Sequence, residues 1–505
     1  MKTVLGLDIG TTRTRAVAVD ESGQVVAASS AGYPLLSPRT GWSEQDPADW
    51  WQASREVLGR VAADVGSDVG GLGLTGQMHG SVFLDENGDV IRPALLENDQ
   101  RTALQSDQIA QRIGAERLIE ITGNPALTTF QAPKILWLRD VEPVQYRHVR
   151  HVLLPKDYVR LMLTGELATD VSDASGTLLF DVRRRAWSHQ ILAALDIPPE
   201  WLPAVFESAE AACRLLPSLA SELGLPSGIT VAAGAGDRAA AAIAAGIVES
   251  GRISSSIGSS GMLFAHADQL VIDPSGRLQA FCDAVPHRWA LMAITLSAGA
   301  SLSWWRNILG ATMTYDQLAT LASSAPPGAE GLFFLPYLMG ARTPHLDPGG
   351  RGAFVGLRAH HTKAHLTRAV MEGVVFSLRD GLEVMRGLGL DIRHIRTTGS
   401  ARRSPFWRQL QADIFNLPVE RTVVDEGPAY GAALLAGVTS GIFESVHQAT
   451  QRVRVREAVN EPDAEQVRRY EGVYATYRQL YPALYSGASS ALAVQGSRYN
   501  PARGA

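Results

Sequence analysis

A strand, a turn of small residues and a second strand occur together twice in this chain. The first copy turns at Gly10–Arg13 and the second at Gly258–Gly261. The flanking strands are expected at Val4–Asp8 and Thr14–Asp20 in the first copy, and at Arg252–Ile257 and Met262–Ala265 in the second. Short apolar runs bounded by Gly, Ser and Thr are typical of β-hairpins. Because each copy opens a half of similar length, the repeat favours a duplicated α/β architecture.

The repeat also sets the expected division of the chain. A sequence of 505 residues is longer than one ordinary core, and its 46% hydrophobic and 19% charged residues are typical of globular domains. We expect a first domain at 1–248 and a second at 249–482, with the boundary near 246–252. Residues 486–505 are rich in Ser, Gly and Ala without apolar periodicity, and a frayed tail is expected over 483–505.

Two other expected strands end in residues that can enter a cleft. Val69–Thr75 is followed by Gln77-Met78-His79, and Ile229–Ala233 is followed by Gly234-Ala235-Gly236-Asp237, where an alanine-rich helix begins. The region 101–225 is expected to be helical, with breaks at Pro133, Pro155 and Pro198-Pro199. Further helices are expected at Tyr315–Ser323, Lys363–Arg386, Ser404–Phe415, Gly427–Gly437 and Glu465–Tyr481.

Charge and composition exclude several classes of protein. The net charge of −5 gives no overall attraction to nucleic acid or to an anionic membrane, so neither partner is expected. Met1 is followed almost directly by a strand, without the charged and apolar segments of a signal peptide. Cys213 and Cys282 lie apart from each other and from any histidine cluster with metal-ligand spacing, which argues against a zinc site. A reduced, cytoplasmic protein is expected.

Lysine is nearly absent from the chain. It occurs only at Lys2, Lys134, Lys156 and Lys363, and no Gly-Lys pair exists. A Walker-type phosphate loop with its lysine is therefore excluded. If the protein handles ATP, its phosphate loops must rely on backbone N–H groups and hydroxyls.

Asp8 ends the first strand directly before the first small-residue turn. Gly10 permits a tight turn, and Thr11 and Thr12 offer hydroxyls and N–H groups to phosphate oxygens. A carboxylate at the strand end can hold Mg²⁺, directly or through water. The alternative is an ordinary hairpin turn in which Asp8 caps backbone groups.

Asp237 lies among apolar residues at the start of a helix. A buried carboxylate without a partner is costly, so this side chain must be hydrogen-bonded, neutral or functional. The helix N-terminus would keep it ionised, and an ionised, shielded carboxylate can accept a proton from a substrate hydroxyl during phosphoryl transfer. The alternative is a plain helix N-cap.

Three other polar segments allow both a functional and an ordinary interpretation. Gln77-Met78-His79 can project into a cleft, or His79 can be a satisfied core or surface residue. Glu97–Arg101 is a dense polar cluster that can also be a helix cap with a solvated face. Thr397–Ala401 joins a strand to a helix, where it can approach a nucleotide or form a simple turn.

The order of these motifs resembles that of the FGGY family of carbohydrate kinases over about residues 3–482. The motifs that carry the resemblance are Asp8–Thr12, Trp42–Trp51, Gly76–Gly80, Leu154–Tyr158, Thr164–Glu166, Ser172–Thr177, Phe334–Leu338 and Arg342–Pro344. The tryptophan-rich segment and Gln77-Met78-His79 are most similar to the branch of the family that phosphorylates xylulose.

The resemblance implies an actin-like ATPase (ribonuclease H-like) α/β fold of two similar domains, with ATP, Mg²⁺ and sugar in the cleft between them. It implies that Asp237 is the catalytic base and that Asp8 is the acidic residue near the metal. The other implied site residues are Gln77, Met78, His79, Glu97, Asn98 and Arg238 for the sugar, and Gly10, Thr11, Thr12, Arg13, Gly258, Ser259, Ser260, Gly399 and Ser400 for ATP. Closure of the domains around both substrates would exclude water.

The chain departs from the family pattern at three places. Glu97 stands where a tryptophan is usual, and Arg238 stands where an asparagine is usual. Thr398-Gly399-Ser400-Ala401 replaces a glycine triplet followed by alanine. We consider two explanations for Glu97 and Arg238: an ion pair across the sugar pocket, or an Arg238 that is free to bind a carboxylate or phosphate on another substrate.

The expected function is ATP- and Mg²⁺-dependent phosphorylation of a terminal hydroxyl of a small sugar, with D-xylulose giving D-xylulose 5-phosphate as the leading reaction. One alternative is a kinase for another ketose, sugar alcohol or sugar acid, because of Glu97 and Arg238. Another is a noncatalytic sugar- or nucleotide-binding regulator, because of the altered nucleoside loop, although a pure binder needs no base. Homodimers are common in the family, so the resemblance allows a homodimer.

Overall fold

The structure is a computed structural model, and it describes residues 2–66, 68–421, 427–452 and 459–485. The chain forms two compact units, each built from separate stretches of sequence. Unit 1 comprises Met1–Ser250, Ala265–Leu291 and Val423–Arg454, and unit 2 comprises Gly251–Phe264, Met292–Thr422 and Val455–Ala505. Segments from the second half of the sequence thus pack with unit 1. The limits 1–248 and 249–482 for two family domains stay a prediction.

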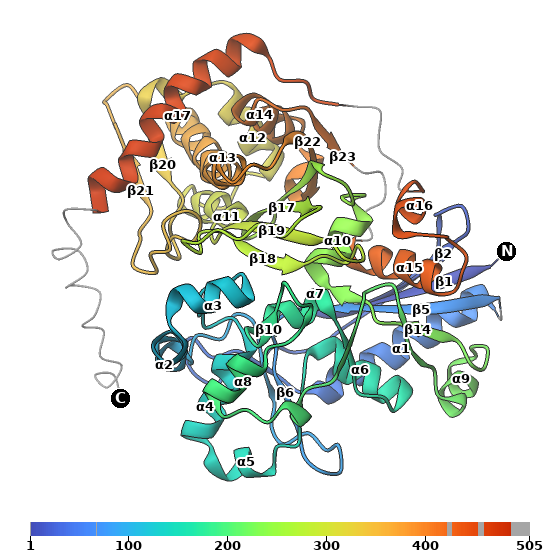
Figure 1. The fold of residues 1–505 in the computed structure, drawn as a ribbon. Coiled ribbons are helices and arrows are strands. Elements are labelled where there is room, and N and C mark those ends of the chain that lie inside the picture. The colour runs from blue at the N-terminus through green and yellow to red at the C-terminus, as the bar shows by residue number, and fades with distance from the viewer. Residues whose placement is uncertain (1, 67, 422–426, 453–458, 486–505) are drawn as a thin grey trace. The chain divides into compact units, whose positions relative to one another are not determined.

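Unit 1 is built on a sheet in which the antiparallel opening meander is extended by parallel strands (Figure 1). The strand order is β13-β14-β5-β1-β2-β3, and β15 also pairs with β5. The bounds are β1 Thr3–Ile9, β2 Arg13–Asp20, β3 Val25–Gly32, β5 Val69–Gly76, β13 Ala211–Arg214, β14 Thr230–Ala232 and β15 Ala235–Gly236. Strands β14 and β15 both run parallel to β5, and β5 runs parallel to β1. The hairpin formed by β1 and β2 and the strand before Gln77 are where the sequence predicted them.

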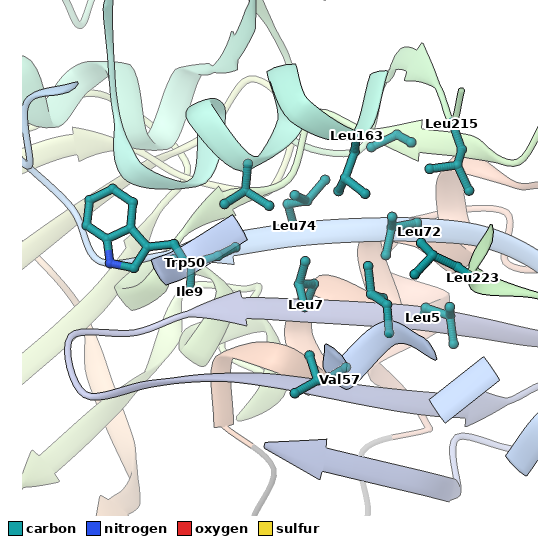
Figure 2. Close-up of a cluster of buried hydrophobic side chains, with 14 of the residues drawn as sticks. Leu5, Leu7, Ile9, Trp50, Val57, Leu72, Leu74, Leu163, Leu215 and Leu223 are labelled. Atoms are coloured by element: carbon teal, nitrogen blue, oxygen red, sulfur yellow. The ribbon is translucent and has the colours of Figure 1, made fainter. Parts of the chain in front are cut away.

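One face of this sheet carries the hydrophobic core of unit 1. Leu5 and Leu7 of β1 lie beside Leu72 and Leu74 of β5, and helix α1 (Pro47–Val65) contributes Val57 to the same cluster (Figure 2). All five side chains are fully buried. Burial of a leucine side chain stabilises a fold by roughly 1.5–3 kcal/mol, so this layer fixes the sheet from which the site residues emerge.

The other face of β1 and β5 is covered by α15 (Gly427–Thr439) at very short range. A Cβ atom added to Gly6 would lie 1.9 Å from the Ala429 carbonyl oxygen, and one added to Gly73 would lie 2.0 Å from that of Ala432. The strands therefore carry no side chain where the helix backbone crosses them. Helix α10 (Asp237–Ala244) contacts the same helix, since a Cβ on Gly431 would lie 1.9 Å from the Ala240 carbonyl oxygen.

The helical middle region follows in unit 1. Its helices are α2 Ala103–Ile113, α3 Ala115–Thr122, α4 Gln131–Val141, α5 Pro143–His148, α6 Pro155–Thr164, α7 Val171–Ala174, α8 His189–Leu195 and α9 Pro217–Leu223. Short strands accompany them: β4 Glu44–Gln45, β6 Val82–Leu84, β7 Ala94–Leu95, β8 His151–Leu153, β9 Ala168–Asp170, β10 Phe180–Asp181, β11 Ala186–Trp187, β12 Ala204–Phe206 and β18 Gln279–Cys282. Pro155 opens α6 as expected, whereas Pro133 lies in the first turn of α4 instead of marking a break. A proline is tolerated there because the first N–H groups of a helix have no partner within it.

Unit 2 contains the second meander and a set of parallel strands. Strands β19, β17, β16, β22 and β23 follow one another in its sheet, and the division between the units runs through β17 and β19. The bounds are β16 Gly251–Ile257, β17 Gly261–Ala267, β19 Trp289–Thr295, β20 Phe333–Leu335, β21 Ala353–Val355, β22 Ile392–Gly399 and β23 Val419–Arg421. The helices are α11 Gly299–Ile308, α12 Tyr315–Ser323, α13 Lys363–Gly387 and α14 Pro405–Phe415, and α17 Ala464–Tyr485 closes the described chain. Helix α16 (Val446–Thr450) belongs to unit 1.

Helix α17 packs through a row of tyrosines on the long helix α13. Tyr470, Tyr474 and Tyr477 are buried, and their spacing places them on one face of the helix. The Tyr470 hydroxyl donates to Glu372 at 2.7 Å, and that of Tyr474 donates to Asp380 at 2.7 Å. The sequence predicted this helix only as a polar closing element.

The helix also extends further than expected. Because α17 ends at Tyr485, residues 483–485 are helical and do not fray, which corrects the start of the expected tail. Residues 486–505 lie outside the described residues. Within the described ranges, no helix combines the length and the apolar character that crossing a membrane requires.

Candidate active site

Three parallel strands bring both predicted aspartates to one edge of the unit 1 sheet. Asp8 of β1 is paired with Thr75 of β5, and Ala235 of β15 is paired with the same residue from the other side. Asp237 follows β15 directly and opens α10. The carboxyl ends of parallel strands are where ligands bind in α/β sheets. The sheet therefore places Asp8 and Asp237 near each other, and the negative charge of Asp237 contributes to the pKa of Asp8.

The surroundings of Asp8 favour its neutral, protonated form. Burial, together with the neighbouring Asp237, raises its pKa from 3.8 to about 8, although Arg15 and Arg238 oppose the shift. Its Oδ1 atom is inaccessible and has no hydrogen-bond partner in the described part of the chain. Asp8 does not cap backbone groups through this atom, as the hairpin-turn alternative would require, and the atom can accept a cation or a proton.

Asp237 is the first residue of α10, and the residue in the cap position is Gly236. No side-chain capping bond forms, so the plain N-cap alternative does not describe this helix. Burial raises the pKa of Asp237, Glu97 acts in the same direction, and Arg238 and His79 oppose them. From the sequence, the helix N-terminus was expected to keep Asp237 ionised. In the folded protein, desolvation has the larger effect and raises the pKa of this carboxyl group.

The loop after β1 is a closed turn that is tied to the side chain of Gln45. The Gly10 N–H donates to the Arg13 carbonyl at 3.1 Å, which closes the turn, and Gln45 Nε2 donates to the Thr11 carbonyl at 2.7 Å. Gln77 Nε2 donates to Gln45 Oε1 at 3.0 Å. Gln77 therefore supports this loop, whereas the sequence grouped it with the sugar contacts.

His79 is fixed in a strained backbone conformation with one ring nitrogen engaged. Its φ of 67° is unusual for a residue with a side chain, and its Nδ1 lies 2.6 Å from the carbonyl oxygen of Gly176. Nδ1 therefore carries the proton and donates it, which leaves Nε2 as a free acceptor. Burial lowers the pKa of His79 to about 3, so the ring is neutral. Lys134, itself buried, donates from Nζ to the His79 carbonyl at 2.8 Å.

The predicted Glu97–Arg238 ion pair does not form in the described structure. Arg238 has Asp237 as its carboxylate neighbour, with 3.6 Å between Nε and Oδ1. Glu97 is half-buried, and its charge contributes to the pKa of both Asp237 and Arg238 without direct contact. Residue type alone does not place side chains that come from separate elements, which is why the predicted pairing was wrong.

The rest of the Glu97 segment is structural or exposed. Asn98 is exposed, so the structure does not bring it into the buried group around Asp237. Asp99 is buried and pairs with Arg101 at 2.6 Å, and Arg101 also contacts Glu44 at 2.7 Å. Arg101 lies over the ring of Trp42, with 3.6 Å from the guanidinium carbon to the ring centroid. This network holds the segment beside the site.

Unit 2 contains a cavity of about 890 Å³ beside the second small-residue turn. Its lining includes Gly258 and Ser259 after β16, and Gly299 and Ala300 at the start of α11. The Gly299 N–H donates to the Gly258 carbonyl at 2.8 Å, and a Cβ on Gly299 would lie 2.3 Å from that oxygen, so only glycine fits. The cavity is large enough for a nucleoside.

The aromatic side chains of this cavity were missed by the sequence analysis. Trp304, Tyr315 and Trp407 belong to its lining, and α11 itself was not predicted. The sequence signal from which α11 could have been predicted is the spacing of small residues before Trp304-Trp305. From the predicted nucleoside loop, Ala401 and Arg403 line the cavity, directly after Gly399 and Ser400 at the end of β22.

A separate histidine cluster lies in unit 2. Glu330, His360 and His361 have ligand atoms within 4.8 Å of one another. The Nδ1 of His361, however, accepts the backbone N–H of Arg358 at 3.0 Å, so its proton is on Nε2, the nitrogen that a metal would need. We therefore interpret the cluster as hydrogen-bonded capping groups before α13.

Comparison with known proteins agrees with this geometry. The model of the FGGY carbohydrate kinase N-terminal domain matches residues 3–244, and that of the C-terminal domain matches 253–440. A xylulose kinase of Lactococcus lactis is 39% identical over 95% of this chain and 97% of its own length. Solved structures of a xylulose kinase and of a gluconate kinase, both from Lactobacillus acidophilus, are each 27% identical with a TM-score of 0.92. They cover 98% and 97% of this chain, respectively, and 99% of their own chains.

These matches span nearly the whole chain and both halves of the predicted architecture. The actin-like α/β fold expected from the sequence is confirmed. The kinase class is likewise confirmed, because both family models describe carbohydrate kinases. The chain belongs to the FGGY family of carbohydrate kinases.

Proposed function

We propose that this protein transfers the γ-phosphoryl group of ATP to the terminal hydroxyl of D-xylulose, giving D-xylulose 5-phosphate. The observation that carries the proposal is the carboxyl group of Asp237 beside Asp8 at the carboxyl edge of the unit 1 sheet, with an Oδ1 that has no hydrogen-bond partner among the described residues. The substrate follows from the relatives, since the Lactococcus lactis xylulose kinase shares 39% of its residues with this chain.

Asp237 is the proposed general base. As the sugar oxygen bonds to the γ-phosphorus, the bond between that phosphorus and the ADP oxygen breaks and the hydroxyl proton passes to Asp237. Its buried Oδ1 has no hydrogen-bond partner in the described residues, so a lone pair is available. Burial raises its pKa, which strengthens it as a base compared with an exposed aspartate.

Asp8 fits a magnesium ion by its chemistry. Mg²⁺ prefers oxygen ligands and keeps several waters, and the unpartnered Oδ1 of Asp8 offers one oxygen donor. Bound there with ATP, the ion would neutralise phosphate charge. The proton that Asp8 holds in the free protein would have to leave when a cation binds.

The nucleotide is assigned to the unit 2 cavity and to the two small-residue turns. Stacking on Trp304, Tyr315 or Trp407 suits an adenine ring, because aromatic faces pack with bases. The turns Gly10–Arg13 and Gly258–Ser260 would present backbone N–H groups to phosphate oxygens. Gly399 and Ser400 are proposed to approach the nucleoside.

The sugar is assigned to unit 1. The free Nε2 of His79 can accept a hydrogen bond from a sugar hydroxyl, and Met78 is buried beside it. Arg238 can donate to sugar oxygens from its position next to Asp237. We infer a cytoplasmic enzyme, where ATP is available, that needs no nucleic acid or membrane partner; a homodimer remains an inference from the family.

A kinase for a sugar acid is the second candidate, and one observation favours it. Arg238 is not paired with Glu97, and its contact with Asp237 is through Nε at 3.6 Å, so the terminal nitrogens of its guanidinium can bind a substrate carboxylate. The gluconate kinase and the xylulose kinase from Lactobacillus acidophilus match this fold equally well, with TM-scores of 0.92. Overall shape therefore does not discriminate between the two substrates.

The test is ADP release with Mg-ATP across D-xylulose, other ketoses, polyols and gluconate, on wild type and on Arg238→Asn. We expect the highest kcat/KM with D-xylulose, and we expect the variant to retain that preference. Preference of the wild type for gluconate, lost in Arg238→Asn, would replace xylulose by a sugar acid. No sugar-dependent release with any acceptor, despite ATP binding, would favour a noncatalytic regulator.

A further inference from the structure

A buried hydrogen-bond chain runs from a charged cluster to the residue before Asp237. Lys156 of α6 lies with Nζ 3.0 Å from Oδ1 of Asp170, at the end of β9. The other oxygen of Asp170 accepts the Ser172 hydroxyl at 2.5 Å. The Ser172 oxygen then accepts the backbone N–H of Gly236 at 3.1 Å. Every member of the chain is buried.

Gly236 lies directly before Asp237, so a small displacement of its backbone would also move the carboxyl group of Asp237. It pairs with Gly76 at the end of β5, and a Cβ added to it would lie 3.0 Å from Met78 Cγ. It has no side chain through which its position could be fixed. Its position is fixed through its backbone, by the pairing with β5 and by the N–H group that donates to Ser172, and this position sets that of the neighbouring Asp237.

The hydroxyl of Ser172 makes both contacts at once. It donates its single proton to the carboxylate of Asp170 and offers a lone pair to the Gly236 N–H. Lys156 lies on the other side of Asp170, beside Oδ1, and the Ser172 N–H donates at 2.8 Å to the same Oδ2 that accepts the Ser172 hydroxyl. The hydroxyl proton is thus oriented toward Asp170, and the lone pair is oriented toward Gly236.

We infer that Ser172 is a positioning residue for Asp237, acting through the backbone of Gly236. The inference rests on the proposed role of Asp237 as the base. Misplacement of a catalytic group by about 1 Å costs on the order of a hundredfold in rate, so a smaller shift here should lower kcat measurably. The sugar and ATP contacts would be left in place.

Ser208 provides a matched control inside the same network. Its hydroxyl donates to the same oxygen of Asp170, at 3.1 Å, and it is equally buried. It makes no side-chain bond to Gly236; its backbone carbonyl accepts the Gly234 N–H at 2.9 Å, and this bond survives a change to alanine. Ser208→Ala therefore removes one bond to Asp170 without releasing Gly236.

The experiment compares Ser172→Ala with Ser208→Ala by kcat, by KM for sugar and ATP, and by melting temperature. We expect Ser172→Ala to lower kcat about tenfold or more with both KM values within about twofold, and Ser208→Ala to keep kcat within about threefold. If Ser172→Ala does not fold, Ser172→Cys takes its place, because a thiol is a weak donor and acceptor. Equal kcat losses in both variants, or a lower melting temperature with unchanged kcat, would overturn the inference.

Asp237→Asn in the same assay tests the role of Asp237 as the base separately from the positioning role of Ser172. If Asp237→Asn is inactive and Ser172→Ala behaves like Ser208→Ala, the base stands and Ser172 is merely structural. If Asp237→Asn turns over normally, the proposed base is wrong, and the positioning role falls with it.

Discussion

At the scale of single residues, burial makes the ionised form of Asp8 unfavourable in the folded protein. Its pKa of about 8 means that the folded protein holds a proton which the unfolded chain has already lost above pH 3.8. The group thus lowers the free energy of unfolding increasingly as pH rises from about 4 to about 8. Such a cost is typical of functional sites, where buried charge serves ligands rather than stability.

Asp8→Asn should therefore stabilise the ligand-free protein in a pH-dependent way. The amide cannot ionise, so the melting temperature of the variant should exceed that of the wild type by more at about pH 8 than at about pH 5.5. The same variant should lose most kinase activity. Thermal unfolding without Mg-ATP measures the difference, and an advantage that is equal at both pH values would contradict the raised pKa.

Sequence reasoning proposed Asp8 and Asp237 as site residues, but it did not predict their raised pKa values. Asp8 was proposed because it ends a strand before a glycine turn, and Asp237 was proposed because it follows such a turn at the start of a helix. Their raised pKa values depend on burial by distant segments, which no local pattern contains. The error over Glu97 and Arg238 has the same origin, since the pairing depends on side-chain placement across separate elements.

At the scale of elements, α15 is the helix that fixes both strands and the start of the site. It contacts β1 and β5 on one side and α10, which begins with Asp237, on another (Figure 1). The contacts are backbone to backbone, so they leave no room for adjustment. The sequence predicted this Gly- and Ala-rich helix at Gly427–Gly437. Small residues indicate that the helix packs closely on another element, but they do not identify that element.

Gly73→Ala should be strongly destabilising because its Cβ would lie 2.0 Å from the Ala432 carbonyl oxygen. We expect a loss on the order of 3 kcal/mol in the free energy of unfolding. Gly472→Ala in α17 is the control, since a Cβ there meets nothing within 4 Å. It should stabilise by about 0.5–1 kcal/mol, because alanine favours helix over glycine. Similar effects of both changes in urea unfolding would contradict the packing described for α15.

At the scale of the whole molecule, the two reactants are assigned to different units. Both aspartates and His79 belong to unit 1, and the cavity beside Ser259 belongs to unit 2. The repeated hairpins predicted the two-part architecture. They could not predict that residues 265–291 and 427–452 pack with unit 1, because unit membership depends on long-range packing.

Filling the unit 2 cavity should impair ATP use selectively. Ala300→Leu adds bulk to the lining, so the KM for ATP should rise about tenfold or more, while the KM for the sugar stays within about twofold. Ser303→Ala, in the same helix and lining the same cavity, removes an atom instead and should change neither value by more than about twofold. A larger effect on the sugar than on ATP in steady-state kinetics would place the nucleotide elsewhere.

The central claim is that Asp237 accepts the proton of the sugar hydroxyl, and Asp237→Asn tests it most directly. The measurement is D-xylulose-dependent ADP release, with ATP binding by calorimetry and the melting temperature recorded on the same preparation. We predict a fall in kcat of about a thousandfold or more, with ATP affinity within about twofold of the wild type. Turnover within tenfold of the wild type in a folded, ATP-binding variant would contradict the account.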